Sequence, residues 1–177
     1  IDRMEGLKYY KKAADLGDVD AMYLYAWISY NGEDVPVNKQ EAAKYYKKAI
    51  DEYGDVQSMT YYALMLQSGD SVPMDKKKAA EYFKIAADNG SDLACVEYGN
   101  ALLKGDGVPM NKKEGARYLK MSADSGSLLG MFEYGLALYR GDGVTVDKRS
   151  AAYYLKMAAD DGLPDAISIY AQMLENG

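Results

Sequence analysis

The side chains most often used for catalysis near neutral pH are scarce in this sequence. It contains no histidine and a single cysteine, Cys95. Histidine is the usual general base and the commonest metal ligand, so serine–histidine catalysis, cysteine–histidine catalysis and the usual zinc sites are excluded. One cysteine also excludes an intramolecular disulfide framework.

The acidic residues do not form a recognisable active site either. Asp106 and Asp142 lie in Gly-Asp-Gly turns, which lack the Gly-Lys-Ser/Thr of a phosphate-binding loop and the ligand pattern of a calcium loop. Asp160 and Asp161 lie at a predicted helix end, where we expect water to solvate them. An active site would be a set of polar residues that occurs once in the chain, and the sequence contains no such set. We therefore expect no enzymatic activity, no catalytic residue, no cofactor and no metal.

Charge and composition narrow the class of partner. The formal net charge is −6, whereas proteins that bind nucleic acid usually carry a basic excess, so we expect no nucleic-acid partner. No apolar run approaches the roughly 20 residues of a membrane span, so we expect no direct membrane insertion. A lone cysteine fits a reducing compartment, and we expect a cytoplasmic protein, although exported proteins can also lack disulfides.

Two interleaved series of similar segments recur at intervals of 36 or 37 residues. The first series superimposes without gaps over residues 6–15, 42–51, 79–88, 115–124 and 151–160. The second starts at Ala21 and places a tyrosine four residues on in each copy: Tyr25, Tyr62, Tyr98, Tyr134 and Tyr170. Apolar and small residues in both series repeat with the 3.6-residue period of a helix.

Helix-capping residues divide the repeats into ten short helices. Asn or Asp at 2, 38, 75, 111 and 147 suits the N-cap of the first series. Glycines at 17, 54, 90, 126 and 162 suit the left-handed position that ends a helix. We expect helices at 2–15, 19–30, 38–52, 55–67, 75–88, 91–103, 111–124, 127–139, 147–160 and 163–175. Helices of the Tyr25 type are called A helices, and those of the first series B helices.

A pair of such helices cannot bury its apolar stripe alone, so neighbouring pairs must stack into an all-α solenoid. We expect one solenoid domain over residues 1–177. It consists of a B-helix half repeat (1–17), four repeats (18–54, 55–90, 91–126 and 127–162) and an A-helix half repeat (163–177). Neither end carries an obvious polar cap, and we expect a piece of a longer solenoid or ends covered by partners.

The repeat resembles the Sel1-like family, which is related to tetratricopeptide repeats. The clearest copy is Ala94–Pro109, ACVEYGNALLKGDGVP, followed by Gly115–Gly126. Tetratricopeptide repeats fit less well, because their period is nearer 34 residues and their turns lack Gly-x-Gly-Val-Pro. Two turns depart from the pattern, at Gly32–Asp34 and Gly69–Ser71, which puts their local geometry in question. The resemblance implies a right-handed α-solenoid of antiparallel helix pairs with an adaptor or scaffold role. Relatives linked to β-lactam binding are cysteine-rich, unlike this chain.

Equivalent positions of the five repeats form columns, and columns that hold the same or similar residues indicate either the core or a solvated face. The Tyr25 column and the column of Tyr10, Tyr46, Phe83, Leu119 and Leu155 form the expected core. Cys95 occupies a methionine-rich column, and we expect a buried thiol rather than a nucleophile. A lysine column, beginning at Lys11, lies four residues before an aspartate column, beginning at Asp15. We favour intrahelical ion pairs there over a charged ladder for a partner.

Positions that differ between repeats mark a candidate binding surface. On each A helix the residues equivalent to 23, 27 and 30 lie nearly opposite the core stripe, yet many are aromatic or aliphatic. We expect them to line a concave groove: Tyr23, Trp27, Tyr30, Leu64, Gln67, Val96, Asn100, Leu103, Phe132, Leu136 and Tyr139. The other interpretation is that the chain itself, or a missing flanking segment, covers this stripe.

The function expected from these features is a protein-interaction scaffold or adaptor that holds a segment of a partner protein or peptide in the groove. The alternative is a structural spacer, or a component of a larger assembly, with no separable ligand site. The partner could then be a larger complex or further repeats of a longer parent chain.

Overall fold

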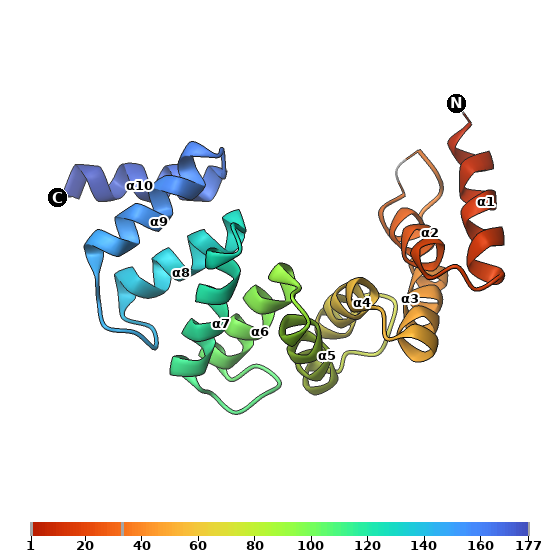
Figure 1. The fold of residues 1–177 in the computed structure, drawn as a ribbon, viewed down its shortest axis with the longest axis horizontal. Coiled ribbons are helices and arrows are strands. Elements are labelled where there is room, and N and C mark those ends of the chain that lie inside the picture. The colour runs from red at the N-terminus through yellow and green to blue at the C-terminus, as the bar shows by residue number, and fades with distance from the viewer. Residues whose placement is uncertain (1, 33, 177) are drawn as a thin grey trace. The chain divides into compact units, whose positions relative to one another are not determined.

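The computed structural model describes residues 2–32 and 34–176, and these residues contain ten α-helices (Figure 1). Their bounds are α1 Arg3–Asp15, α2 Val19–Asn31, α3 Lys39–Tyr53, α4 Val56–Ser68, α5 Lys76–Asp88, α6 Asp92–Lys104, α7 Lys112–Asp124, α8 Leu128–Arg140, α9 Lys148–Asp160 and α10 Pro164–Asn176. The all-α solenoid and its ten helices are confirmed. Residues 1 and 177 of the two predicted half repeats lie outside the described residues.

Asn and Asp side chains begin the B helices as the sequence predicts. The carboxylate of Asp2 accepts from the Glu5 amide at 3.1 Å, and that of Asp75 accepts from the Lys78 amide at 2.9 Å. Asn38, Asn111 and Asp147 cap α3, α7 and α9 in the same way. The A helices α2, α4, α6 and α8 have caps of their own that the sequence reading missed: Asp18, Asp55, Ser91 and Ser127. Each cap satisfies an amide that the first turn leaves unpaired.

The turns that follow the A helices share one left-handed position, although the residue there is not always glycine. Gly107 and Gly143 adopt positive φ angles of 75° and 77°. At the matching positions Asp34 and Ser71 adopt 59° and 63°. Asp34 and Ser71 therefore adopt the backbone conformation that glycine has in the other turns, and each carries the strain of a left-handed non-glycine residue. Residue 33 of the predicted Gly32–Asp34 turn lies outside the described residues.

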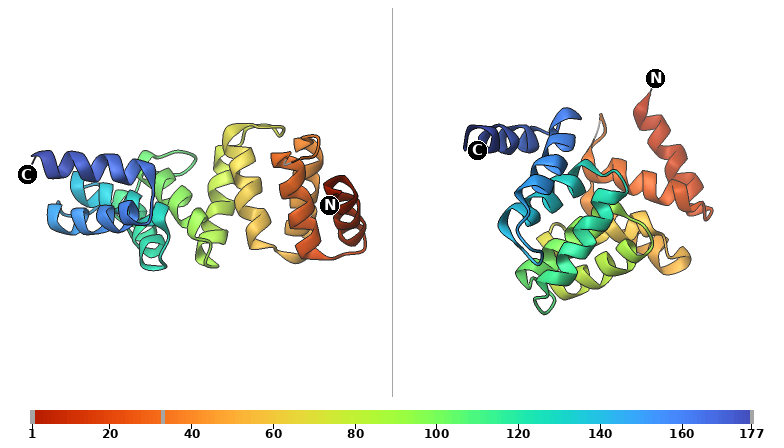
Figure 2. Two further views of the ribbon diagram at one scale, coloured as in Figure 1. Left: turned by 90° about the horizontal axis from the view of Figure 1, so that it is seen from above. Right: turned by 60° about the vertical axis from the view of Figure 1, so that its left-hand side comes forward.

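The chain divides into two compact units, residues 1–82 and 83–177, with the boundary inside α5. In the first unit α2 packs on α1 and α3, and α3 packs on α4. In the second, α6 packs on α7, α7 on α8, α8 on α9 and α9 on α10, and α6 also contacts α8. The antiparallel course of α8 and α9 can be followed from two further directions in Figure 2.

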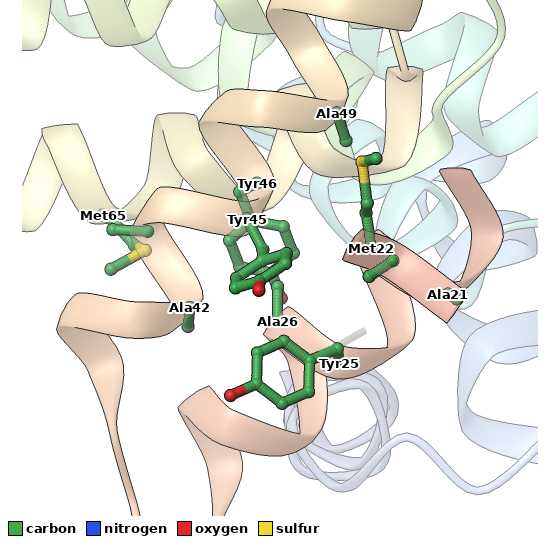
Figure 3. Packing of buried hydrophobic residues seen from close by; sticks show 11 residues of the cluster. Ala21, Met22, Tyr25, Ala26, Ala42, Tyr45, Tyr46, Ala49 and Met65 are labelled. Carbon is green, nitrogen blue, oxygen red and sulfur yellow. The ribbon is translucent and has the colours of Figure 1, made fainter. Parts of the chain in front are cut away.

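Tyrosine rings join the A and B helices within each unit. Tyr25 of α2 and Tyr45 of α3 meet edge to face with ring centroids 4.6 Å apart (Figure 3). Met22 reaches towards Ala49 in the same core (Figure 3). The second unit repeats the tyrosine pair at 4.9 Å between Tyr98 and Tyr118. Edge-to-face pairs favour one relative orientation of the rings, so these contacts set how each A helix sits on its B helix.

Candidate functional site

In the first unit the predicted face of α2 is aromatic and only partly covered. Tyr23, Trp27 and Tyr30 are half-buried and pack against the apolar core of this unit. The ring of Tyr23 lies 5.8 Å from that of Tyr61 and 6.2 Å from that of Tyr46, centroid to centroid. Burial raises the pKa of the Tyr23 hydroxyl well above its ordinary value. The face is therefore a fixed aromatic surface rather than a set of free side chains.

A hydrogen-bonded cluster fixes the end of this face. The Tyr30 hydroxyl donates to Asp70 Oδ2 at 2.8 Å. Lys39 Nζ lies 2.6 Å from the same oxygen and 4.7 Å from the centre of the Tyr30 ring. Lys39, and after it Tyr30, holds the pKa of the Asp70 carboxyl below its usual value. Leu64 and Gln67 of α4, also predicted for the groove, are half-buried.

Trp27 borders a pocket at the α1 end of the first unit. The pocket has a volume of about 290 Å³, and Leu7, Tyr10 and Ile28 form much of its apolar wall. An aromatic side chain beside an apolar pocket is typical of an anchor point for a partner. Trp27 is half-buried, so one part of its indole supports the core and another part remains available.

In the second unit the structure corrects two of the predicted positions. Val96 is 1% exposed and Leu136 is 8% exposed, so both belong to the core and offer no surface to a partner. The helical wheel places them away from the B helices, but α6 and α8 contact each other directly and cover this part of both helices. For these two residues the interpretation that the chain itself covers the stripe is the correct one.

The other predicted residues of the second unit remain accessible to different degrees. Asn100, Leu103 and Phe132 are half-buried, and Tyr139 is 39% exposed. Leu103 and Phe132 pack against the core cluster of this unit. Each unit thus keeps its own accessible part of the predicted face, and we use the name A-face for these residues: Tyr23, Trp27, Tyr30, Leu64 and Gln67 in the first unit, and Asn100, Leu103, Phe132 and Tyr139 in the second.

An acid that was not predicted from the sequence lies beside the A-face. Glu133 follows Phe132 on α8 and is half-buried. Burial raises the pKa of its carboxyl, while Lys104, the Asn100 amide and Arg140 act in the opposite direction. The side chain of Asn100 forms a hydrogen bond with Glu133 and is therefore engaged within the unit. The signal for Glu133 in the sequence is an acidic residue within the otherwise apolar stretch of α8.

The charged columns of the B helices form intrahelical ion pairs. Lys47–Asp51, Lys84–Asp88, Lys120–Asp124 and Lys156–Asp160 all pair four residues apart. Lys11 is an exception, because its ammonium instead lies 2.5 Å from Glu41 of α3. Exposed pairs of this kind contribute only a few tenths of a kcal/mol, so we interpret these columns as a solvated, locally stabilised face.

Cys95 is a core residue, as the sequence predicts. It is 3% exposed, and burial raises the pKa of its thiol to about 11. A protonated, buried thiol is a poor nucleophile. Within residues 2–32 and 34–176, no three acidic or cysteine side chains gather closely enough to hold a metal ion. None of the helices described is both long and apolar enough to cross a membrane.

A family model for the Sel1 repeat matches residues 2–18, 19–53, 56–91, 92–127 and 128–163. Comparison with curated proteins gave no match. Among solved structures, the chain is similar to a Sel1 repeat protein from Oxalobacter formigenes, with a TM-score of 0.86, 22% identity, and coverage of 93% of this chain and 65% of that one.

Two further structures share the fold. The protective antigen c5321 from uropathogenic Escherichia coli, which displays an SLR fold, has a TM-score of 0.57 and 25% identity, and the match covers 99% of this chain and 45% of the antigen. Helicobacter pylori cysteine rich protein B has a TM-score of 0.58 and 25% identity, with coverage of 72% and 96%. The chain thus spans less than two thirds of the length of the first two structures.

Proposed function

Because this chain belongs to the Sel1 repeat family, whose members are generally scaffolds for protein–protein interactions, we propose that it is a non-enzymatic adaptor that binds a partner protein through its A-face. The observation that carries this proposal is the aromatic surface of α2. Tyr23, Trp27 and Tyr30 lie on one face of this helix and stay half-buried, and the helix that carries them is capped by Asp18 and Gly32. Large side chains on a partly uncovered face are typical anchors for a partner.

The A-face differs from repeat to repeat, and this supports specificity for one partner. The first unit presents tyrosine and tryptophan on α2 with a leucine and an amide on α4, and the second presents an amide and a leucine on α6 with a phenylalanine and a tyrosine on α8. A regular scaffold with variable side chains can match an extended or helical segment. The fixed positions of Tyr23 and Tyr30 lower the entropy lost on binding.

Affinity capture with paired variants tests this proposal. The test variant is Trp27→Ala/Phe132→Ala/Tyr139→Ala, which truncates the A-face. The control is Tyr9→Ala/Ile85→Ala/Tyr153→Ala, which removes exposed apolar side chains from the B helices. Circular dichroism and thermal melting select preparations in which both variants stay folded.

We expect wild type and the control to retain the same partner and the A-face variant to lose it. Loss of the partner from the control, with the A-face variant unaffected, would move the site to the B helices. Identical partners for all three proteins would instead favour a structural spacer or a component of a larger assembly.

A further inference from the structure

Two pairs of lysines lie on the solvent-facing side of α1 and α3. Lys8 and Lys12 belong to α1, and Lys44 and Lys48 occupy the equivalent positions of α3, one repeat later. Lys48 is half-buried and the other three are exposed. The members of each pair are four residues apart, which places their charges on one helix face about 6 Å apart along the axis. We call these four residues the lysine patch.

The two helices that carry the patch lie side by side in the first unit. The Tyr45 hydroxyl of α3 donates to Asp15 of α1 at 2.5 Å, and Lys48 Nζ lies 3.4 Å from the Ala14 carbonyl oxygen. Between the helices is a notch of about 300 Å³, lined by Asp15, Lys44, Tyr45 and Lys48. Lys44 Nζ also lies 5.7 Å from the centre of the Tyr45 ring. The patch is therefore one surface that crosses two helices and contains a hollow.

The charges of the patch are not compensated by carboxylates of this chain. Among residues 2–32 and 34–176, none of the four lysines forms an ion pair. Two carboxylates of α3 are already engaged by other lysines, since Glu41 pairs with Lys11 and Asp51 pairs with Lys47. Like charges four residues apart repel each other and destabilise a helix. Each lysine pair therefore costs stability that an anionic ligand would restore.

The repeat does not need two cations at these positions in order to fold. The later B helices hold Glu81 and Ile85, Arg117 and Met121, and Tyr153 and Met157 there. The cation among them, Arg117, is paired with Glu114 of its own helix at 2.7 Å. Because the fold accepts such different side chains, packing does not explain the two lysine pairs of the first unit, whereas binding of an anion does.

The surroundings of the patch limit the length of an anionic ligand. Acidic residues lie at both ends of the two helices, with Glu5 and Glu41 in the first turns and Asp15 and Glu52 in the last. A nucleic acid or an anionic membrane extends past the patch and would be repelled by these carboxylates. An extended peptide places alternate side chains on one face about 7 Å apart, close to the spacing within each lysine pair. A few acidic residues therefore fit between the flanking carboxylates.

We propose that the lysine patch binds a short, extended acidic segment of a partner protein. One carboxylate of the segment enters the notch and pairs with Lys44 and Lys48, and others pair with Lys8 and Lys12. Binding removes the repulsion within each lysine pair. Attraction between the patch and the acidic segment also speeds their association.

This surface goes beyond the adaptor function proposed above, because it lies on the B helices and uses no residue of the A-face. It also leaves Tyr9 uncovered. Tyr45 of α3 faces back towards α1, so its counterpart Tyr9 lies on the flank of α1 that faces away from α3.

Fluorescence anisotropy with the full chain tests the proposal. The probe is a peptide of sequence DEDEDE labelled with tetramethylrhodamine, and NQNQNQ with the same label is the uncharged reference. The test variant is Lys44→Gln/Lys48→Gln. Its matched control is Lys120→Gln/Lys156→Gln, which removes the same two charges from α7 and α9, where each lysine pairs with an aspartate of its own helix. Circular dichroism checks that both variants are folded.

We expect saturable binding of DEDEDE and none of NQNQNQ. Lys44→Gln/Lys48→Gln should weaken binding at least about fivefold, adding Lys8→Gln/Lys12→Gln should weaken it further, and the control should keep the wild-type affinity. The affinity should fall as NaCl rises from about 50 to about 500 mM, because salt screens exposed charges. The variant Trp27→Ala/Phe132→Ala keeps the patch and should bind the peptide normally, which separates this test from that of the A-face.

Three results would overturn the proposal. The first is no saturable binding of DEDEDE, or equal weakening by the test variant and its control, which would show an effect of net charge alone. The second is tighter binding, through the same four lysines, of single-stranded DNA or of vesicles that contain phosphatidylserine. The third is self-association in sedimentation that Lys44→Gln/Lys48→Gln abolishes, because the acidic occupant would then be a second copy of this chain.

Discussion

At the scale of single residues, tyrosine fills core positions of this chain, and its ring and hydroxyl contacts also orient the neighbouring helices. The B-helix tyrosines at 45, 118 and 154 contact an A-helix tyrosine edge to face. The same hydroxyls donate to the aspartate one repeat earlier, at 2.5 Å from Tyr45 to Asp15 and 2.7 Å from Tyr118 to Asp88. Each of these tyrosines therefore joins the A and B helices of its own repeat through its ring and reaches the preceding repeat through its hydroxyl.

Two phenylalanine substitutions test what a buried tyrosine hydroxyl contributes with and without a hydrogen-bond partner. Tyr118→Phe removes a buried hydroxyl that donates to a carboxylate, and we expect it to lower the free energy of unfolding by about 1 kcal/mol. Tyr46→Phe removes a buried hydroxyl that has no hydrogen-bond partner among the described residues. We expect this change to be neutral or slightly stabilising, because no bond is lost and an unpaired polar group leaves the core. Urea unfolding followed by circular dichroism measures both, and equal losses would contradict the assignment.

Glu133 gives the chain a pH-dependent term with a predictable sign. Burial raises the pKa of this carboxyl in the folded state, so the folded protein holds this proton more tightly than the unfolded chain. The stability that this contributes is complete below the unfolded pKa and is lost as pH rises through the folded pKa. Above the folded pKa the ionised carboxylate is a partly buried charge that costs stability.

We accordingly expect Glu133→Gln to raise the urea midpoint relative to wild type at pH 7.5, with the advantage disappearing at pH 4. Glu81→Gln is the matched control, because it removes an exposed carboxylate from α5 and should show no such pH-dependent gain. A Glu133→Gln protein that is less stable than wild type at pH 7.5 would indicate that Asn100, Lys104 and Arg140 outweigh the cost of burial.

At the scale of elements, the turn after α8 and the turn after α3 differ in how much space surrounds their glycines. A Cβ atom added to Gly143 would lie 1.9 Å from the Lys112 carbonyl oxygen. A Cβ at Gly54, which also has a positive φ angle, would meet nothing within 4 Å. The first position needs glycine for both backbone conformation and space, and the second for conformation alone.

Alanine at the two positions should therefore have unequal costs. We expect Gly54→Ala to lower the free energy of unfolding by about 1 kcal/mol, from the left-handed backbone. Gly143→Ala should lower the free energy of unfolding by roughly 2–4 kcal/mol, because the new Cβ atom must also displace the neighbouring backbone. Thermal and urea unfolding measure the difference, and similar costs at both sites would show that the turn at Gly143 adjusts freely.

The helices themselves were predictable from the sequence, because caps and periodicity are local signals. The observed bounds differ from the predicted ones by about one residue. The covering of Val96 and Leu136 was not predictable, since it depends on how one A helix meets the next. Nor did the repeat comparison single out the Tyr45 column, although tyrosine recurs at this position in all five copies. Its hydrogen bonds join different repeats and need three-dimensional coordinates.

At the scale of the whole molecule, the charge pattern agrees with a protein partner. Several lysines form ion pairs within their own helix or with the next repeat, and the chain keeps a net charge of −6. The acidic excess disfavours a polyanion as the partner, whereas the A-face offers aromatic and aliphatic side chains. Affinity at that face would come mainly from buried apolar area, with the polar residues around it setting specificity.

Site-specific photo-crosslinking in cells tests the A-face most directly. Benzoyl-phenylalanine would replace Trp27 or Phe132 on this face, and Tyr9 or Tyr153 on the B helices as controls. We predict crosslinked adducts with one partner protein from positions 27 and 132 and none from positions 9 and 153. Adducts from the two B-helix positions alone would contradict the account and show that this solenoid binds its partner through the opposite helices.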